Sequence, residues 1–239
     1  GLRDSMVSAI DWFFSHEEAG IILEDDCIPS PDFFKLMESL LAQYRYDQRV
    51  WGATGSNPVR LESGGDFSYG FVRSALVWGW ASWADRWRRF DRDLSLYRSR
   101  GWRNNFSAWP TTDEYHALNW QLNRIVQSPN PTSWAYPLAW SVTFHDGLWA
   151  VPRSNLVVNA GFRPDGTHTT KTRKLADFSS LGTINHPPRV LRDARLQREV
   201  HRHHHRVLHP SALNYLRDRY RDIKSSFSSL LYSRSPSRV

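Results

Sequence analysis

The chain has 239 residues, which is enough for one good-sized domain and a tail. A single cysteine excludes a disulfide framework within the chain, and no apolar run approaches the roughly 18 residues of a transmembrane helix. The net charge of +7 is unevenly spread: residues 171–239 carry 15 Lys and Arg against 5 Asp and Glu, a net +10, whereas residues 1–170 carry 16 against 19, a net −3. The basic character therefore belongs to the tail, which disfavours a nucleic-acid-binding body.

The first part of the chain alternates between helical and strand patterns. Met6, Ile10 and Phe14 recur at helical spacing, and Gly20 is the expected end of that helix. Ser30 has the features of an N-cap, with Pro31 at the first helical position. We expect helices over 4–18 and from Pro31 to Tyr44, and strands over 21–23 and 50–54.

The alternation continues further along the chain and predicts an α/β fold with a layered sheet. Residues 78–87 have the pattern of a turn entering a helix, which would put Trp80, Trp83 and Trp87 on one helical face. We expect further helices over 113–127 and 133–144, and strands over 69–77 and, interrupted by Pro152, over 148–158.

Three acidic residues, Glu24, Asp25 and Asp26, directly follow an apolar strand. Adjacent acids at the end of a buried strand repel one another and resist desolvation, so they need a compensating partner. A divalent cation with oxygen ligands, Mg²⁺ or Mn²⁺, is the commonest such partner. Alternation along an extended segment would put Glu24 and Asp26 on one side and Asp25 opposite. We expect a metal and a phosphate-bearing substrate here; the alternative is a solvated acidic cluster.

This segment resembles a known family. Residues 21–34, Ile-Ile-Leu-Glu-Asp-Asp-Cys-Ile-Pro-Ser-Pro-Asp-Phe-Phe, are similar to the metal-site segment of nucleotide-sugar-dependent glycosyltransferases with the GT-A fold. The similarity is greatest to a bacterial group called glycosyltransferase family 2-like, and extends to the Glu-Asp-Asp segment of animal N-acetylglucosaminyltransferases of the first type. Further matches follow in the expected order, at residues 78–87, 151–162 and 166–170.

The resemblance implies roles for individual residues. Asp26 would ligate the metal, and Glu24 and Asp25 would contact the nucleotide or the metal shell. His168 is at the point where this fold often supplies a histidine to the metal or diphosphate. Trp80 would help to bind the nucleotide-sugar by shaping the sugar or acceptor pocket; the alternative is that its segment packs the following helix.

The chain departs from the family pattern in two ways. Several nucleobase-binding strands normally precede the acidic motif, but only one helix precedes it here, so we expect an apparently N-terminally truncated GT-A-like mixed sheet flanked by helices. Relatives commonly have aspartate at the position of Ala135, within Ser133–Tyr136, and that aspartate is a good candidate for the base that deprotonates the acceptor. Asp113 and Glu114 are the expected substitutes.

The resemblance covers about residues 1–170, which we expect to form the glycosyltransferase domain, followed by a basic tail over 171–239. Residues 211–232 form a basic amphipathic pattern that would suit an anionic membrane surface or pack on the body. We expect a cytoplasmic protein, peripheral at the inner membrane face. Its expected partners are a nucleotide-sugar donor and a saccharide or other hydroxyl acceptor, but no nucleic acid.

The predicted function is metal-assisted transfer of a sugar from a nucleoside diphosphate to a hydroxyl group. Two alternatives use the same acidic site. A metal-dependent nucleoside-diphosphate hydrolase would need no acceptor pocket. A non-catalytic nucleotide- or sugar-binding remnant would explain both Ala135 and the short N-terminal region.

Overall fold

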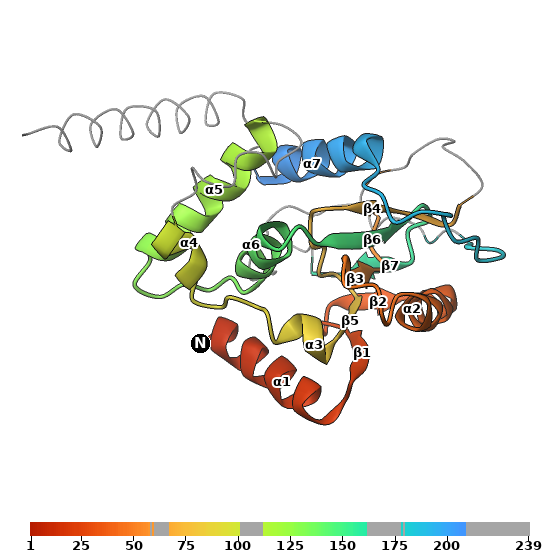
Figure 1. Ribbon diagram of the computed structural model, residues 1–239, viewed down its shortest axis with the longest axis horizontal. Helices are drawn as coiled ribbons and strands as arrows, with labels where there is room; N and C mark the ends of the chain where they lie inside the picture. Colours follow the sequence, from red (N-terminus) through yellow and green to blue (C-terminus); the bar gives the residue numbers. More distant parts are fainter. Residues whose placement is uncertain (58, 60–66, 101–111, 162–177, 179, 209–239) are drawn as a thin grey trace, which may run out of the picture. The chain divides into compact units, whose positions relative to one another are not determined.

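Two sheets organise the first of two compact units, Gly1–Val200 (Figure 1). The computed structural model describes residues 1–57, 59, 67–100, 112–161, 178 and 180–208. The strands are β1 (Ala19–Ile22), β2 (Cys27–Pro29), β3 (Val50–Thr54), β4 (Tyr69–Val72), β5 (Trp80–Trp83), β6 (Leu148–Pro152) and β7 (Val157–Asn159). The larger sheet has the order β1-β5-β3-β6-β4 and is mixed: β3 and β6 are parallel, and the other neighbours are antiparallel. The second sheet pairs β2 with β7.

The helices come both before and between these strands, so the chain has the α/β organisation that its patterns predict. They are α1 (Leu2–His16), α2 (Pro31–Gln43), α3 (Ala84–Trp87), α4 (Ser95–Arg100), α5 (Thr112–Gln127), α6 (Ala135–Phe144) and α7 (Ala194–Leu208). Residues of α7 from His201 onward belong to the second unit. Among the described helices, none combines the length and the apolar character needed to cross a membrane.

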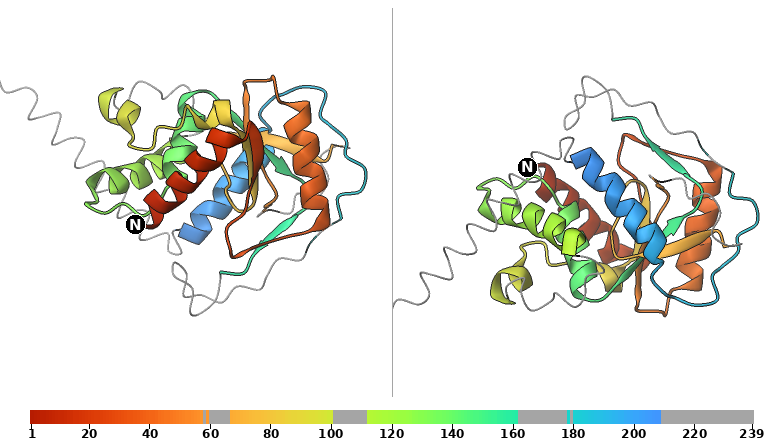
Figure 2. Two further views of the ribbon diagram at one scale, coloured as in Figure 1. Left: turned by 90° about the horizontal axis from the view of Figure 1, so that it is seen from below. Right: turned by 90° about the horizontal axis from the view of Figure 1, so that it is seen from above.

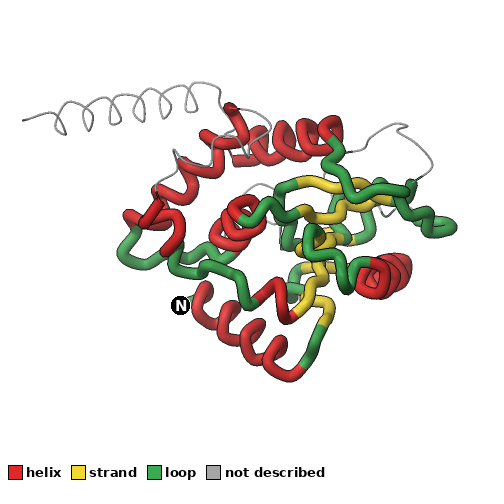
Figure 3. Tube along the Cα trace, viewed as in Figure 1, coloured by secondary structure: helices red, strands yellow, loops and turns green. Residues whose placement is uncertain are grey.

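Helices cover both faces of the larger sheet. Buried side chains of α2 share one hydrophobic cluster with β3, β4, β5 and β6. Those of α1, α6 and the first part of α7 share a second cluster with the opposite face of the same strands. Figure 2 shows the strands between α2 on one side and α1 and the first part of α7 on the other, and Figure 3 distinguishes these strands from the helices by colour. These two clusters lie on opposite faces of the sheet, and a third cluster of Leu94, Tyr97, Leu122 and Trp140 joins α4, α5 and α6.

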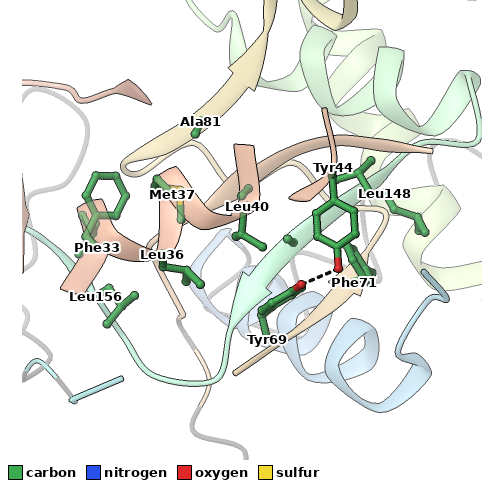
Figure 4. Packing of buried hydrophobic residues seen from close by; sticks show 14 of the residues in the cluster. Phe33, Leu36, Met37, Leu40, Tyr44, Tyr69, Phe71, Ala81, Leu148 and Leu156 are labelled. Atoms are coloured by element: carbon green, nitrogen blue, oxygen red, sulfur yellow. Dashed lines mark hydrogen bonds between the residues drawn. The ribbon is translucent and has the colours of Figure 1, made fainter. Parts of the chain in front are cut away.

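The helix α2 follows its predicted pattern. It begins at Pro31, whose missing N–H costs nothing in the first turn, and Ser30 is the N-cap residue in extended conformation. Ser30 makes no side-chain capping hydrogen bond, so its backbone rather than its hydroxyl marks the start. Figure 4 shows the apolar face of this helix, where Tyr44 is hydrogen-bonded to Tyr69 of β4. The buried residues of this face are Phe33, Leu36, Met37, Leu40 and Tyr44.

The tryptophan segment differs from its prediction. Residues 80–83 form the strand β5, and the helix that follows has only four residues, so Trp80, Trp83 and Trp87 do not share a helical face. Side chains three apart on a strand point to opposite faces. Trp83 accordingly lies in the α2 cluster and Trp80 in the opposite one, each 1% exposed.

Some boundaries also differ from expectation. The first helix ends at His16, and Gly20 is a residue of β1, where a Cβ atom would lie 2.2 Å from the ring of Phe13. Close packing, not helix termination, therefore explains this glycine. The strand that begins at Tyr69 ends at Val72. The first compact unit extends beyond residue 170 to Val200, while residues 211–232 lie outside the described part of the chain.

A buried arginine joins α2, β3 and α3. The Arg86 side chain is fully buried and donates hydrogen bonds to three backbone carbonyls, those of Tyr44, Asp47 and Val50, at 3.1–3.3 Å. Its Nη1 also donates to both carboxylate oxygens of Asp85, at 2.7 and 2.8 Å, and its guanidinium lies 4.4 Å from the ring centroid of Trp83. These partners satisfy a charge that would otherwise be costly to bury.

We expect Arg86→Ala to destabilise the fold by roughly 3–5 kcal/mol, because it leaves the carbonyls and Asp85 without their buried donor. Urea denaturation followed by tryptophan fluorescence measures the change. Arg88→Ala is the matched control. Arg88 lies two residues after Arg86 and is exposed, so this substitution should change the free energy of unfolding by no more than about 0.5 kcal/mol. Equal stability of the two variants would contradict the role given to Arg86.

Candidate functional site

The acidic triplet lies in a tight turn between β1 and β2. The backbone N–H of Cys27 donates to the carbonyl of Glu24 at 3.0 Å, which closes a turn with Asp25 and Asp26 at its centre. Glu24, Asp26 and Cys27 each offer one ligand atom, and these three atoms all lie within 4.8 Å of one another. Asp25 is exposed. The expected proximity of Glu24 and Asp26 is confirmed, but a turn produces it rather than an extended strand.

The second sheet holds this turn from one side. Cys27 pairs with Asn159 in the β2–β7 ladder, and the N–H of Ala160 donates to the carbonyl of Asp26 at 2.7 Å. The N–H of Gly161 donates to the Asn159 side chain at 2.8 Å. A Cβ atom on Gly161 would lie 2.4 Å from Oδ2 of Asp26, so a larger residue would require the Asp26 carboxylate to move. The 151–162 motif is thereby brought against the acidic motif.

The larger sheet holds Glu24 from the other side. Ile22, the last residue of β1, pairs with Trp80 of β5. The ring of Trp80 lies 5.8 Å from that of Trp134, centroid to centroid, and the Trp134 side chain is close enough to the Glu24 carboxylate to lower its pKa. The start of α6 is therefore connected to the acidic turn.

Burial and mutual repulsion dominate the electrostatics of the turn. Burial raises the pKa of Glu24, and the charges of Asp26 and Asp25 raise it further, while the nearby Trp134 side chain lowers it. Burial, followed by the charges of Asp26 and Glu24, raises the pKa of Cys27 to about 12. The thiol of Cys27 lies 3.7 Å from Oδ1 of Asp26. A thiol with so high a pKa is a poor nucleophile.

The donor set suits a hard divalent cation. Glu24 and Asp26 supply carboxylate oxygens on one side of the turn, and a cation would offset the repulsion that raises the pKa of Glu24. Mg²⁺ and Mn²⁺ prefer such oxygens, whereas the neighbouring Cys27 would contribute only as a softer sulfur ligand. The residues present therefore fit Mg²⁺ or Mn²⁺ with Glu24 and Asp26 as the holding groups.

Of the other predicted site residues, the structure describes the side chains of Glu114 and Trp80. Glu114 is buried on α5, where it interacts with Gln197 and with the charges of Arg192, Arg198 and Arg73. Burial raises its pKa to about 7 despite these arginines. The predicted residue Asp113 belongs to the same helix, but its side chain lies outside the described residues, as does His168.

Trp80 lies beside the site but within the core. Trp80 is 1% exposed, so it offers no ring surface for stacking on a sugar in this structure. Its position fits the alternative interpretation, in which its segment packs against the following helix. Its ring contacts those of Trp87, Trp134 and Trp149, with centroid separations of 5.8–6.0 Å. Trp134 and Gly161 are the residues that sequence reasoning missed as parts of the site. Gly161 lies in the segment 151–162 and Trp134 in Ser133–Tyr136, the segments that carry the family comparison. Nothing in the sequence indicates that either residue lies near the acidic turn.

Comparison of the chain with models of known protein families gives no match, and comparison with curated protein sequences gives no significant match.

Proposed function

We propose that the chain is a glycosyltransferase that moves a sugar from a nucleoside diphosphate to a hydroxyl acceptor, with Mg²⁺ or Mn²⁺ at the acidic turn. The observation that carries this proposal is the convergence of Glu24 and Asp26 in one turn at the end of β1, backed closely by Gly161. A mixed sheet with ligand-holding groups beyond a strand end also supports a GT-A-like fold, as the resemblance implies.

The proposed site divides its work among few groups. Asp26 and Glu24 would hold the cation, which when bound stabilises the negative charge on the departing nucleoside diphosphate. The turn fixes the backbone of both residues before any ligand arrives, which reduces the ordering needed on binding. Burial of Glu24 limits competition from water and strengthens its attraction to a cation.

Nucleotide binding tests the proposal. We expect the full-length protein to bind UDP or GDP in the presence of Mn²⁺, measured by isothermal titration calorimetry, and to lose this binding in EDTA. Asp26→Asn should weaken it by at least about tenfold, because it removes a charged ligand. Glu38→Gln makes the same charge change at an exposed position of α2 and should have no effect. Binding that ignores Mn²⁺, or that survives Asp26→Asn unchanged, would contradict the proposal.

One observation favours the alternative function, a protein that binds a nucleotide or sugar without catalysis. It concerns the position of the catalytic base. Ala135 is the first residue of α6 and directly follows Trp134, whose side chain lowers the pKa of Glu24. The position where relatives carry aspartate is thus next to a residue of the acidic site. Alanine cannot accept a proton there, so a site that binds its ligands could still turn over poorly.

We expect Ala135→Asp to raise acceptor-dependent release of UDP from UDP-sugars at least about tenfold, because a general base typically contributes 10²–10⁴-fold. An acidic residue in the first turn of a helix is also well tolerated. Ala139→Asp, one turn further along α6 and also partly exposed, is the control and should give no gain. Product analysis with a panel of saccharide acceptors distinguishes transfer from hydrolysis, since free sugar alone indicates a hydrolase. No gain over the control would count against a base at position 135.

We also propose that the protein works at the cytoplasmic face of a membrane, held there by its basic tail. The support is the amphipathic, positively charged pattern over 211–232. Sedimentation with liposomes containing anionic lipid should therefore carry down the full chain but much less of a chain ending at residue 210. Equal sedimentation of the two would remove the membrane contact from the proposal.

A further inference from the structure

Exposed arginines are concentrated where the chain leaves the β4 edge of the larger sheet and enters α7. In this stretch an isolated β-bridge joins Arg192 to Phe71 of β4, and α7 begins at Ala194 (Figure 1). The stretch belongs to the first compact unit. Its arginines are all exposed, and together we call them the arginine surface: Arg189, Arg192, Arg195 and Arg198.

The start of α7 packs one side against the sheet and turns its arginines away from it. Leu196, Gln197 and Val200 are 0–2% exposed, and Leu196 and Val200 belong to the hydrophobic cluster that this helix shares with α1 and α6. With 3.6 residues per turn, Arg195 and Arg198 lie on the opposite side of the helix. The core already uses the apolar side, so a partner of the folded protein meets α7 on its arginine side.

Hydrogen bonds to the β4 region hold the backbone under the arginine surface. The N–H of Asp193 donates to the carbonyl of Phe71 at 2.8 Å, and its side chain accepts from the N–H of Leu196 at 3.0 Å. Further along α7, the Gln197 side chain donates to the Ser74 hydroxyl at 3.1 Å. The backbone is thus in place before a partner arrives, and binding has to order only the arginine side chains.

A large apolar side chain is exposed among these arginines. Leu191 is 62% exposed, whereas its neighbour Val190 is 9% exposed and belongs to the cluster formed with α2. Leu191 therefore faces away from the core, between Arg189 and Arg192 in the sequence. Basic side chains with an apolar one among them are typical of surfaces that bind at the boundary between lipid headgroups and acyl chains.

We propose that the arginine surface and Leu191 form a docking surface for an anionic lipid membrane. The arginines would bind lipid phosphates, and Leu191 would enter the headgroup layer. A nucleic acid also offers phosphates, but a leucine gives its bases no aromatic ring for stacking, so the lipid surface fits both kinds of side chain. This inference rests on the membrane contact proposed for residues 211–232, to which it adds a contact made by the first unit.

Vesicle sedimentation tests the arginines. The full chain should bind vesicles of phosphatidylcholine and phosphatidylserine, and bind vesicles of phosphatidylcholine alone much less. Combining Arg195→Gln with Arg198→Gln should lower the partition coefficient at least about tenfold, because each arginine near an anionic surface is worth roughly a fivefold change. Arg88→Gln with Arg98→Gln is the matched control. It makes the same charge change at exposed positions after α3 and on α4, and should have an effect within about twofold.

A fluorescent label tests whether the first unit itself reaches the lipid. The full chain with Leu191→Cys is labelled with an environment-sensitive dye; the native Cys27 is buried and its pKa is raised to about 12, so it reacts slowly. Adding the anionic vesicles should raise the emission of the dye at position 191. A dye at Tyr46→Cys, a position that is 91% exposed between α2 and β3, should not respond.

The outcomes separate the proposals. Equal weakening by the two arginine pairs, or sedimentation with no change of the dye at position 191, would overturn the docking surface and leave the contact of the tail intact. An effect of Arg195→Gln with Arg198→Gln on binding to an RNA oligonucleotide, but not to vesicles, would overturn it in favour of nucleic acid. Absence of sedimentation by the unaltered chain would overturn both membrane contacts. Sugar transfer at the acidic turn is tested separately, by Mn²⁺-dependent nucleotide binding.

Discussion

The alternation of side chains along β5 is the constraint on which the rest of the first unit depends. This four-residue strand pairs with β1 on one side and β3 on the other. Trp83 points into the α2 cluster, where Arg86 stacks on it, and Trp80 points into the opposite cluster. A slip of one residue would exchange these faces and bury neither ring correctly. The register of β5 against β1 therefore determines where Glu24 leaves the sheet.

The acidic turn concentrates charge where the surroundings resist it. Glu24 is partly buried beside Asp26, and burial and repulsion both favour its neutral form. A fold gains no stability from such an arrangement, since separate, solvated carboxylates would cost less. The close fit of Gly161 over Asp26 makes the same point, because it holds a carboxylate in a confined place. Groups held at a cost in stability are characteristic of functional sites, and a divalent cation would offset much of that cost.

The sequence predicted correctly those elements whose formation depends on residues close together in the chain. The apolar face of α2 and its start at Pro31 follow from helical spacing and proline geometry. The tryptophan segment was predicted wrongly because spacings of three and seven fit a helix, whereas pairing with β1 and β3, which lie far away in sequence, makes residues 80–83 a strand. The acidic residues of the site were predictable as a triplet. The contacts of Trp134 and Gly161 with them were not, because they arise from long-range packing that no local spacing encodes.

The partly buried Glu24 and the buried Glu114 show how differently the fold treats its acids. Glu24 has acidic neighbours that raise its pKa and Trp134 nearby, which lowers it. Glu114 has arginines and Gln197 nearby, which lower its pKa, yet burial still raises it to about 7. The partners of Glu114 come from β4's C-terminal side and from the start of α7, so its contacts tie α5 to those segments, and none of its described interactions is with the acidic turn. A base must reach the acceptor at the site it serves. Glu114 is thus better explained as a structural carboxyl group, and the question of a base at the acidic turn moves to the first residue of α6, beside Trp134.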